Sequence, residues 1–377
     1  MNAPRILISA GEASSDMYAA SLATALRQRT GAELFGMGGP RMAEAGVELI
    51  ADYHQVAVVG ITEVIHRIPT VVRVQNRLAA EAVKRGASLA ILVDSPGTHL
   101  GVARRLRNRG IPVGYFIGPQ VWAWRAGRVS VVRRLVKQMV VIFPFEEKIY
   151  REAGVAVNFV GHPLLDLVQA TMGRKEFAAR HGLDAKRPIV TLLPGSRKSE
   201  IARHYERVIE ACERLRRSAG GREIQFVHAV APNLKPEMLA PYARPGLEIK
   251  RVEGETYNAI AAADCAIVAS GTATVEAALL GTPMVVIYRV APLTAAILRH
   301  MVHTPFIGMV NLIAGRRVAA ELIQDAFTPE ALETEVRRLL ESESARAEAK
   351  QGLAEVRARM GPGGAIERAA DIFAGML

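Results

Sequence analysis

The chain has 377 residues, of which 50% are hydrophobic, 23% charged and only 5% aromatic. This length favours two domains, and the composition is typical of a compact α/β protein and excludes a disordered chain. The 48 Lys and Arg exceed the 37 Asp and Glu, so the net charge is +11. Such a basic surface suits anionic lipid or phosphorylated substrates, and nucleic acid is the weaker choice because the arginines are dispersed.

The sequence shows no sign of a disulfide, a metal centre or a membrane span. Cys212 and Cys265 lie far apart without metal-ligand spacing, so we expect small core residues in a reducing cytosol. No Asp-x-Asp occurs, so no metal is predicted. The apolar start of the chain is too short for a signal sequence, and no run of 18 uncharged apolar residues exists.

Strand-like and helix-like segments alternate through the first half of the chain. Arg5–Ala10 is an apolar, β-branched run, and a helical pattern follows it from Ser14 to Arg29. Further strands are expected at Leu34–Met37, Ser88–Asp94, Pro112–Ile117 and Gln138–Phe143. This alternation predicts a parallel sheet with helices on both faces.

The pattern restarts after Leu165, beyond a polar connector at Gln169–Arg187. Strands are expected at Pro188–Leu193, Glu223–Val230, Asp264–Ala269 and Pro283–Tyr288. We therefore predict two Rossmann-like domains with parallel sheets that face each other across a cleft. Their expected boundaries are 1–165, completed by the last helix at 362–377, and 166–361.

Ligands of open parallel sheets bind beyond the carboxyl ends of the strands, and two such turns in the second domain suit a nucleotide. Ser270, Gly271 and Thr272 form a small-residue turn before a helix, which suits an anion, and Glu276 inside that helix suits a sugar diol. The other turn holds Gly195, Ser196 and Arg197, whose guanidinium fits a diphosphate. A ligand-free turn and a solvated arginine are the alternatives. P-loop and dinucleotide-binding motifs are absent.

The first domain offers carboxylates and aromatic residues at its strand ends. Asp94 and Glu12 each follow a strand, where burial would raise a carboxyl pKa and suit it to deprotonate a hydroxyl; the alternative for each is a helix N-cap. Gln120, Trp122 and Trp124 suit contacts with a sugar or an acyl chain, or else a packing cluster.

A basic amphipathic segment lies between Gly60 and Leu78. Its apolar residues fall near helical spacing and are Val64, Ile65, Ile68, Val71 and Val72. With arginines among them, this segment suits an anionic membrane surface. An ordinary helix with a buried stripe is an equally good interpretation.

Segments spread nearly from end to end of the chain match the motifs of one family. The most specific segments are the Trp122-Ala123-Trp124 stretch and Asn311–Arg316. The other matching segments are Ala10–Ser14, Gly39–Met42, Phe143–Glu146, Gly161–Pro163, Leu192–Arg197, Ser270–Ala273 and Met284–Val286. With these segments the chain resembles the lipid-A-disaccharide synthase family.

The resemblance implies a GT-B fold and an inverting, metal-independent glycosyl transfer. The donor would be UDP-2,3-diacylglucosamine, the acceptor 2,3-diacylglucosamine 1-phosphate (lipid X), and the product the β-1′,6-linked disaccharide. It also implies peripheral attachment to the cytoplasmic face of the inner membrane. Among the carried-over positions, Asp94 would be the general base, Arg197 the diphosphate partner and Glu276 the ribose ligand. Glu12 and Asn311 are the other carried-over positions, and Asn311 would lie near the nucleotide.

One segment departs from the family pattern. Gly97, Thr98 and His99 stand where the family usually has Asp, Phe and Asn. This departure leaves the identity of the acceptor open and makes His99 a second candidate for the general base. A related UDP-sugar 2-epimerase and a non-catalytic UDP-sugar-binding membrane protein remain alternatives, and the sequence leaves homodimerisation open.

Overall fold

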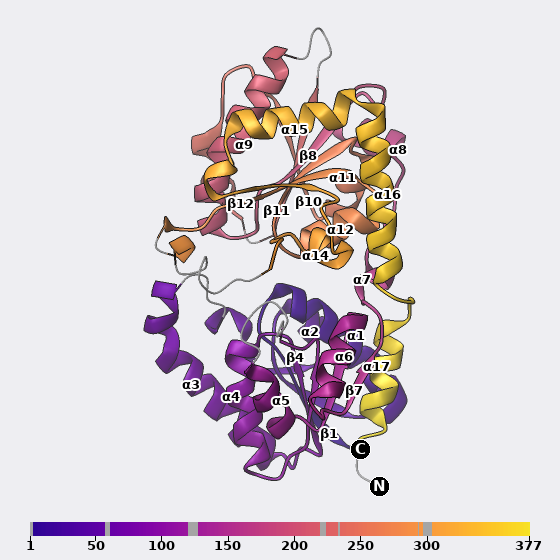
Figure 1. Cartoon of the computed structure of the whole chain (residues 1–377). Coiled ribbons are helices and arrows are strands. Elements are labelled where there is room, and N and C mark those ends of the chain that lie inside the picture. Colours follow the sequence, from indigo (N-terminus) through magenta and orange to yellow (C-terminus); the bar gives the residue numbers. More distant parts are fainter. Residues whose placement is uncertain are drawn as a thin grey trace. The chain divides into compact units, whose positions relative to one another are not determined.

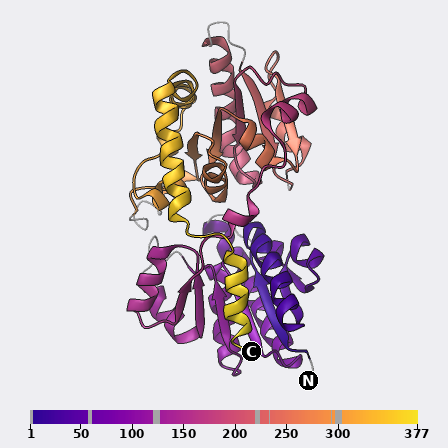
Figure 2. The same cartoon turned by 90° about the vertical axis from the view of Figure 1, so that its right-hand side faces the viewer.

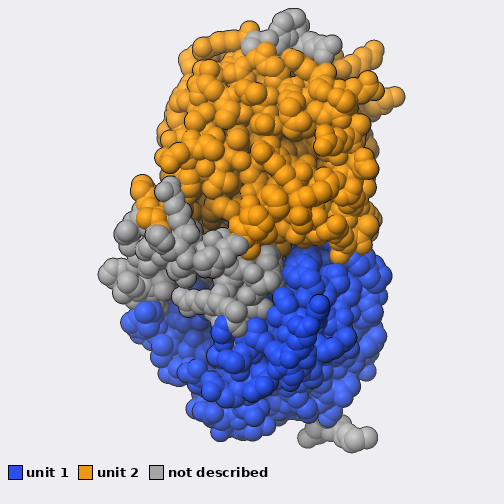
Figure 3. All heavy atoms as spheres, in the orientation of Figure 1, with its two compact units in different colours: residues 1–163, 360–377 blue, residues 164–359 orange. Residues whose placement is uncertain are grey.

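The computed structural model describes residues 3–56, 61–119, 127–218, 224–232, 234–292, 294–296 and 304–377. It divides into two compact units, which Figure 3 colours separately: unit 1 comprises residues 1–163 and 360–377, and unit 2 comprises 164–359. Each unit contains one parallel sheet flanked by helices (Figure 1). The predicted α/β class with two parallel sheets is therefore confirmed.

Unit 1 is built on a seven-stranded sheet in the order β3-β2-β1-β4-β5-β6-β7. Its central strand β4 is Leu-Ala-Ile-Leu-Val, buried on both faces, as a parallel strand between two helix layers must be. The strands are β1 (Arg5–Ala10), β2 (Glu33–Gly38), β3 (Glu48–Asp52), β4 (Leu89–Val93), β5 (Val113–Phe116), β6 (Gln138–Val141) and β7 (Val157–Phe159).

Helices cover both faces of this sheet. The helices are α1 (Ala13–Thr30), α2 (Pro40–Glu44), α3 (Ile61–Lys84), α4 (Pro96–Arg107), α5 (Arg128–Leu135), α6 (Pro144–Glu152) and, from the end of the chain, α17 (Ala365–Ala374). Helices α3, α4 and α5 share one core with the sheet. On the other face α17 lies beside α1 (Figure 2). Phe373 packs edge-to-face on Phe116, and Arg29 of α1 binds Glu367 and Asp371 at 2.5 and 2.6 Å.

Unit 2 is built on a six-stranded sheet in the order β10-β9-β8-β11-β12-β13. Its strands are β8 (Ile189–Leu193), β9 (Gln225–Val230), β10 (Ile249–Glu253), β11 (Cys265–Ala269), β12 (Met284–Tyr288) and β13 (Ala320–Ile323). Its helices are α7 (Leu164–Leu167), α8 (Arg174–His181), α9 (Lys198–Ser218), α10 (Pro236–Leu239), α11 (Thr256–Ala262), α12 (Thr272–Leu279), α14 (Met309–Ala314), α15 (Pro329–Glu341) and α16 (Glu343–Arg359). Single-turn 3₁₀ helices lie at Tyr53–Gln55, Ala240–Tyr242 and Gln324–Ala326.

The core of unit 2 contains both cysteines. Helices α9 and α15 pack on one face of the sheet, and Cys212 and Cys265 are fully buried there as free thiols. Burial raises both thiol pKa values, so the thiols stay protonated and inert. The prediction of small core residues is confirmed.

Both sheets have the strand order 3-2-1-4-5-6 within their first six strands, which is that of a Rossmann sheet. In this order the winding reverses between the first and the fourth strand, and ligands bind beyond the strand ends at that switch point. The switch point is β1/β4 in unit 1 and β8/β11 in unit 2. The four turns that the sequence indicated as sites follow β1, β4, β8 and β11, so all of them lie at the two switch points.

Two sequence expectations differ from the structure. Four strands were missed, namely β3, β7, β10 and β13, and these are the four sheet edges. The polar stretch at Gln169–Arg187, expected as a connector, contains α8, because Phe177 and Ala178 are buried and anchor a helix there.

Candidate functional site

The turn after β4 holds Asp94 in a strained backbone conformation. Asp94 and Ser95 have φ of 53° and 47°, in the left-handed region that non-glycine residues seldom adopt. The turn after β1 fits against this one at Gly11, where a Cβ would lie 2.4 Å from the Ser95 Oγ. The two turns of the unit 1 switch point are thus interlocked.

Two side chains hold this turn by the main chain of Asp94, and a third side chain supports one of them. The His99 Nδ1 and the Tyr115 hydroxyl both donate to the Asp94 carbonyl, at 2.7 and 2.6 Å. Because Nδ1 faces a carbonyl, it carries the proton, and Nε2 accepts from the Ser9 hydroxyl at 2.9 Å. His99 is fully buried, which lowers its pKa to about 4 and keeps it neutral.

The carboxyl groups of Asp94 and Glu12 form a hydrogen-bonded pair. Burial, and then the charge of Glu12, raises the pKa of Asp94 from 3.8 to about 8, with Glu146 contributing further. Asp94 therefore holds a proton at neutral pH.

The N-cap interpretation applies to Glu12 but not to Asp94. Glu12 is the N-cap of α1, where the Ser15 hydroxyl accepts from its N–H at 3.0 Å and Ser14 donates to its carboxylate at 3.0 Å. Ser95, not Asp94, occupies the N-cap of α4. The Asp94 carboxyl therefore does not cap a helix.

In unit 2, an internal carboxylate occupies the turn after β8. Glu200 accepts from the N–H groups of Ser196 and Arg197 at 2.9 and 3.2 Å, and its side chain lies against Gly195. The Arg197 guanidinium pairs with the same carboxylate at 3.1 Å, although 43% of the Arg197 side chain stays exposed. The turn therefore presents a guanidinium, while the backbone N–H groups of Ser196 and Arg197 are already used.

The neighbouring turn, after β11, keeps its backbone donors. Among the described residues, the N–H groups of Gly271 and Thr272 at the start of α12 have no acceptor. Gly271 has φ of 154°, which a side chain would disfavour. Ser270 donates its hydroxyl to the Ile307 carbonyl at 3.0 Å. Glu276 accepts from Tyr257 of α11 at 3.4 Å, a partner that the sequence patterns did not indicate.

Asn311 is buried and engaged by main-chain groups near β13. Its Nδ2 donates to Ala319 O at 2.9 Å and to Glu321 at 2.7 Å, and its Oδ1 accepts from the N–H groups of Val318 and Ala319. Glu321 in turn accepts from the N–H of Ile307, whose carbonyl binds Ser270. Asn311 therefore supports the loop beside the start of α12.

Sequence reasoning also missed His204 of α9. Its Nδ1 donates to the Pro194 carbonyl at 2.7 Å, and its Nε2 accepts from the Arg289 N–H at 2.9 Å. Burial lowers the pKa of His204 and keeps the ring neutral. The sequence feature that could have indicated His204 is a histidine on the helix that directly follows the turn at Pro194.

The remaining predicted contacts are only partly described. Gln120, Trp122 and Trp124 lie outside the described residues, as do the side chains of Val64 and Ile65. On α3, Ile68 is 50% and Val72 38% exposed, whereas Val71 packs against the core. In the part of the chain that the structure describes, no helix is long and apolar enough to cross a bilayer. Those residues also contain no cluster of three metal-ligating side chains.

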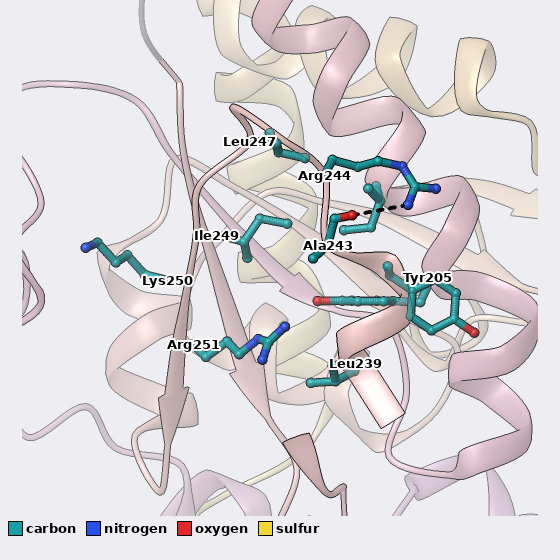
Figure 4. Close-up of a pocket in the computed structure, with 10 residues that line it drawn as sticks. Tyr205, Leu239, Ala243, Arg244, Leu247, Ile249, Lys250 and Arg251 are labelled. Carbon is teal, nitrogen blue, oxygen red and sulfur yellow. Dashed lines mark hydrogen bonds between the residues drawn. The ribbon is translucent and has the colours of Figure 1, made fainter. Parts of the chain in front are cut away.

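A pocket of about 350 Å³ lies elsewhere in unit 2, against the edge strand β10 (Figure 4). Its cations are largely paired, since Arg244 bonds Glu206 and Lys250 binds Glu248 at 2.7 Å. None of the predicted site residues line it; the lining is Tyr205, Ile209, Leu239, Tyr242, Ala243, Arg244, Leu247, Ile249, Lys250 and Arg251. The candidate site therefore stays at the switch points.

Comparison with known proteins identifies the family. The family model of lipid-A-disaccharide synthetase matches residues 6–369. The chain belongs to the lipid-A-disaccharide synthase family. It is 45% identical to the lipid-A-disaccharide synthase of Myxococcus xanthus, over 98% of this chain and 97% of that protein. For the synthase of Geobacter sulfurreducens the identity is 43%, over 99% and 97%.

Solved structures share the fold at low identity. The UDP co-structure of S. aureus MnaA has a TM-score of 0.69 at 13% identity, over 99% of this chain and 98% of that one. The calicheamicin glycosyltransferase CalG4 has a TM-score of 0.61 at 16% identity, over 100% and 99%. UDP-GlcNAc 2-epimerase from Neisseria meningitidis, bound to UDP-GlcNAc, has a TM-score of 0.65 at 12% identity, over 98% and 100%.

These structural likenesses confirm the GT-B fold, and the full-length family membership decides the activity. The chain is a glycosyltransferase of the class that forms the lipid A disaccharide, as the sequence motifs predicted. The epimerase and the non-catalytic alternative are not favoured, since the epimerase likeness rests on the fold alone.

Proposed function

We propose that this chain transfers 2,3-diacylglucosamine from UDP to the 6-hydroxyl of 2,3-diacylglucosamine 1-phosphate, with inversion at the anomeric carbon. The observation that carries the proposal is the opposite chemistry of the two switch points. Unit 1 presents the Asp94 carboxyl, protonated at neutral pH, beside Glu12, and unit 2 presents a guanidinium and backbone N–H groups. Family membership and the shared fold with UDP-bound structures support the choice of donor.

In the proposed reaction, Asp94 acts as the general base in its ionised form. The acceptor oxygen forms a bond to the anomeric carbon, the bond from that carbon to the diphosphate breaks, and the hydroxyl proton passes to Asp94. A carboxyl with a pKa of about 8 holds such a proton well at neutral pH. Glu12, hydrogen-bonded to Asp94, shares the charge. His99 has both ring nitrogens occupied, so we assign it a positioning role.

On the donor side, charge develops on the leaving UDP. The N–H groups of Gly271 and Thr272 at the positive end of α12 suit this diphosphate, and the exposed Arg197 guanidinium suits it as a second partner. Gly195, Ser196 and Ser270 shape the two turns. Glu276, with Tyr257 beside it, is the proposed ligand of the ribose diol. Asn311 supports the loop that Ser270 binds.

The acylated substrates also require a lipid-facing surface. We assign the exposed Ile68 and Val72 to an anionic membrane surface at the cytoplasmic face, together with Val64 and Ile65 of the same helix. Val71 packs against the core, so we assign it to the packing of α3 and not to the membrane surface. Gln120, Trp122 and Trp124 are kept as contacts with the sugar or its acyl chains. Homodimerisation is not needed for any of these roles.

The test is incubation of the purified chain with UDP-2,3-diacylglucosamine and 2,3-diacylglucosamine 1-phosphate. We expect equimolar UDP and disaccharide by mass spectrometry, and a β linkage by proton NMR. A parallel sample without the acceptor should leave the UDP-sugar unchanged. Isomerisation of the sugar in that sample would identify an epimerase instead. UDP-sugar binding without turnover would indicate a binding protein.

A further inference from the structure

We propose that His99, Tyr115 and Ser9 form a clamp that positions the Asp94 carboxyl, and that His99 itself takes no proton from the substrate. This inference rests on the proposed role of Asp94 as base. The three residues are called the Asp94 clamp below. They come from α4, β5 and β1, and so the clamp ties the strands on either side of β4 to the turn that follows it.

The main chain of Asp94 is held at both ends, by the clamp at its carbonyl and by Phe116 at its N–H. The carbonyl oxygen has two lone pairs, and His99 and Tyr115 supply a donor to each, at 2.7 and 2.6 Å. The Asp94 N–H donates to the Phe116 carbonyl at 2.9 Å. With both ends of the residue held, its backbone keeps the left-handed φ of 53° that an aspartate otherwise seldom adopts.

The direction of the carboxyl follows from this backbone conformation. A side chain leaves its Cα at an angle that φ and ψ determine, so relaxation to an ordinary extended conformation would turn the Asp94 carboxyl away from Glu12. The hydrogen bond between the two carboxyls thus depends on the clamp. A misplacement of about 1 Å in a catalytic group costs roughly 100-fold in rate.

The hydrogen bonds of His99 also argue against a role as base. The Nδ1 proton is committed to the Asp94 carbonyl, and the Nε2 lone pair is committed to the Ser9 hydroxyl. The ring has no exposed surface. A general base needs an available lone pair within reach of the substrate proton, and this ring has none.

The chain contains a matched control in unit 2. Tyr205 and His228 are another buried tyrosine–histidine pair, with the Tyr205 hydroxyl 2.9 Å from His228 Nδ1. Neither residue lies at a switch point, and neither has a role in the proposed reaction. Changes there remove comparable buried groups without touching Asp94.

The experiment compares His99→Ala, His99→Asn and Tyr115→Phe with Tyr205→Phe and His228→Asn in the full-length protein. An asparagine amide can replace the Nδ1 donor but cannot act as a base. We expect His99→Ala to lower kcat about 100-fold and His99→Asn to restore it to within about fivefold of wild type. Tyr115→Phe, which removes one of two donors, should lower kcat about tenfold. KM for the UDP-sugar should not change, and the control variants should stay within about twofold of wild type.

The pH profile provides a readout that a purely structural role would not move. If the Asp94 carboxyl turns from Glu12 toward solvent, its pKa falls toward the ordinary value. The pH at which kcat reaches half its maximum should therefore shift downward by at least one unit in His99→Ala and stay in place in His99→Asn.

Several outcomes would overturn the clamp. Loss of activity in His99→Asn equal to that in His99→Ala, at unchanged folding, would identify a catalytic imidazole. Full activity of both His99→Ala and Tyr115→Phe would show that Asp94 holds its position unaided. Failure of the proposed function looks different, because the wild-type protein would then form no disaccharide. If His99→Ala does not fold, the other two clamp variants decide the question.

Discussion

The two switch points have the same frame and opposite chemistry. In unit 1 the turns after β1 and β4 bring two carboxyl groups into hydrogen-bonding contact. In unit 2 the turns after the neighbouring strands β8 and β11 carry a guanidinium and the start of α12. The sheet topology decides only which turns become neighbours, and the few residues in those turns decide which charge is presented.

A neutral histidine supports one turn at each switch point. His99 donates from Nδ1 to the carbonyl of Asp94, and His204 donates from Nδ1 to the carbonyl of Pro194. Each ring also accepts at Nε2, from Ser9 and from the Arg289 N–H. The difference is that His99 holds a strained aspartate, whereas His204 holds a proline. A buried neutral histidine can thus connect two groups rigidly, one at Nδ1 and one at Nε2, in sites of quite different chemistry.

The largest effect should come from the acidic switch point. Asp94→Asn should lower kcat about 100- to 10,000-fold, because an amide cannot accept the hydroxyl proton. UDP affinity should be unchanged, since that binding is assigned to unit 2. Turnover assays with calorimetric titration of UDP measure both quantities. Equal losses in the two would remove Asp94 from the role of base.

The basic switch point should respond almost as strongly but differently. Arg197→Ala should lower kcat about 100-fold and also weaken UDP binding, because the guanidinium is assigned to the diphosphate. Arg217→Ala is the control, since this arginine of the same helix is 78% exposed and paired with Glu213. If Arg197→Ala raised only the KM for the acceptor, the assignment of UDP binding to unit 2 would be wrong.

The pH dependence should come from the acidic switch point alone. With a pKa of about 8, Asp94 is largely protonated at neutral pH, so kcat should rise about tenfold per unit below that value and level off above it. The same shift makes the Asp94 contribution to stability decline as pH rises from about 4 to about 8. Asp94→Asn should abolish that decline. A kcat independent of pH from 6 to 9 would contradict the ionisation.

A smaller effect is expected from the support of the basic switch point. Asn311→Ala removes the partner of several buried main-chain groups and should destabilise the protein by about 3 kcal/mol. Thermal unfolding would measure the loss. Below the unfolding temperature kcat should fall less than in Arg197→Ala, because Asn311 acts through the loop at Ile307. A variant as stable as the wild type would show that the network is dispensable.

The smallest effect concerns α3, outside both switch points. Ile68→Ser with Val72→Ser should reduce partitioning to anionic vesicles about tenfold, since both side chains are exposed. Val83→Ser is the control, because Val83 is 49% exposed near the other end of the same helix. Vesicle sedimentation measures the effect. Equal loss in the control would assign the binding to general hydrophobicity.

The strands that the sequence predicted and those it missed differ by position. Every interior strand of both sheets was expected, because burial on both faces requires a continuous apolar run. The missed strands β3, β7, β10 and β13 all lie at an edge, where one flank meets no neighbouring strand. The edge strand β10 reads Ile-Lys-Arg-Val-Glu and has a single buried residue, so its pattern carries little signal.

The candidate site divides in a similar way. Asp94, Glu12, Arg197 and Glu276 were predicted because each stands in or just after a strand-to-helix turn. Tyr115, His204, Glu200 and Tyr257 were not, since nothing in their local sequence marks them as partners of those turns. Their roles depend on hydrogen bonds to other elements or to main-chain groups.

The sequence by itself determined the interior strands, the four turns and the kinds of chemistry they carry. Apolar runs and small-residue turns are local patterns, and so are readable along the chain. Only the tertiary structure decided which turns meet, that Glu200 occupies the N–H groups of Ser196 and Arg197, and which tautomer His99 adopts. Ser9 and His99 are 90 residues apart, so their bond exists only once β1 and β4 are paired.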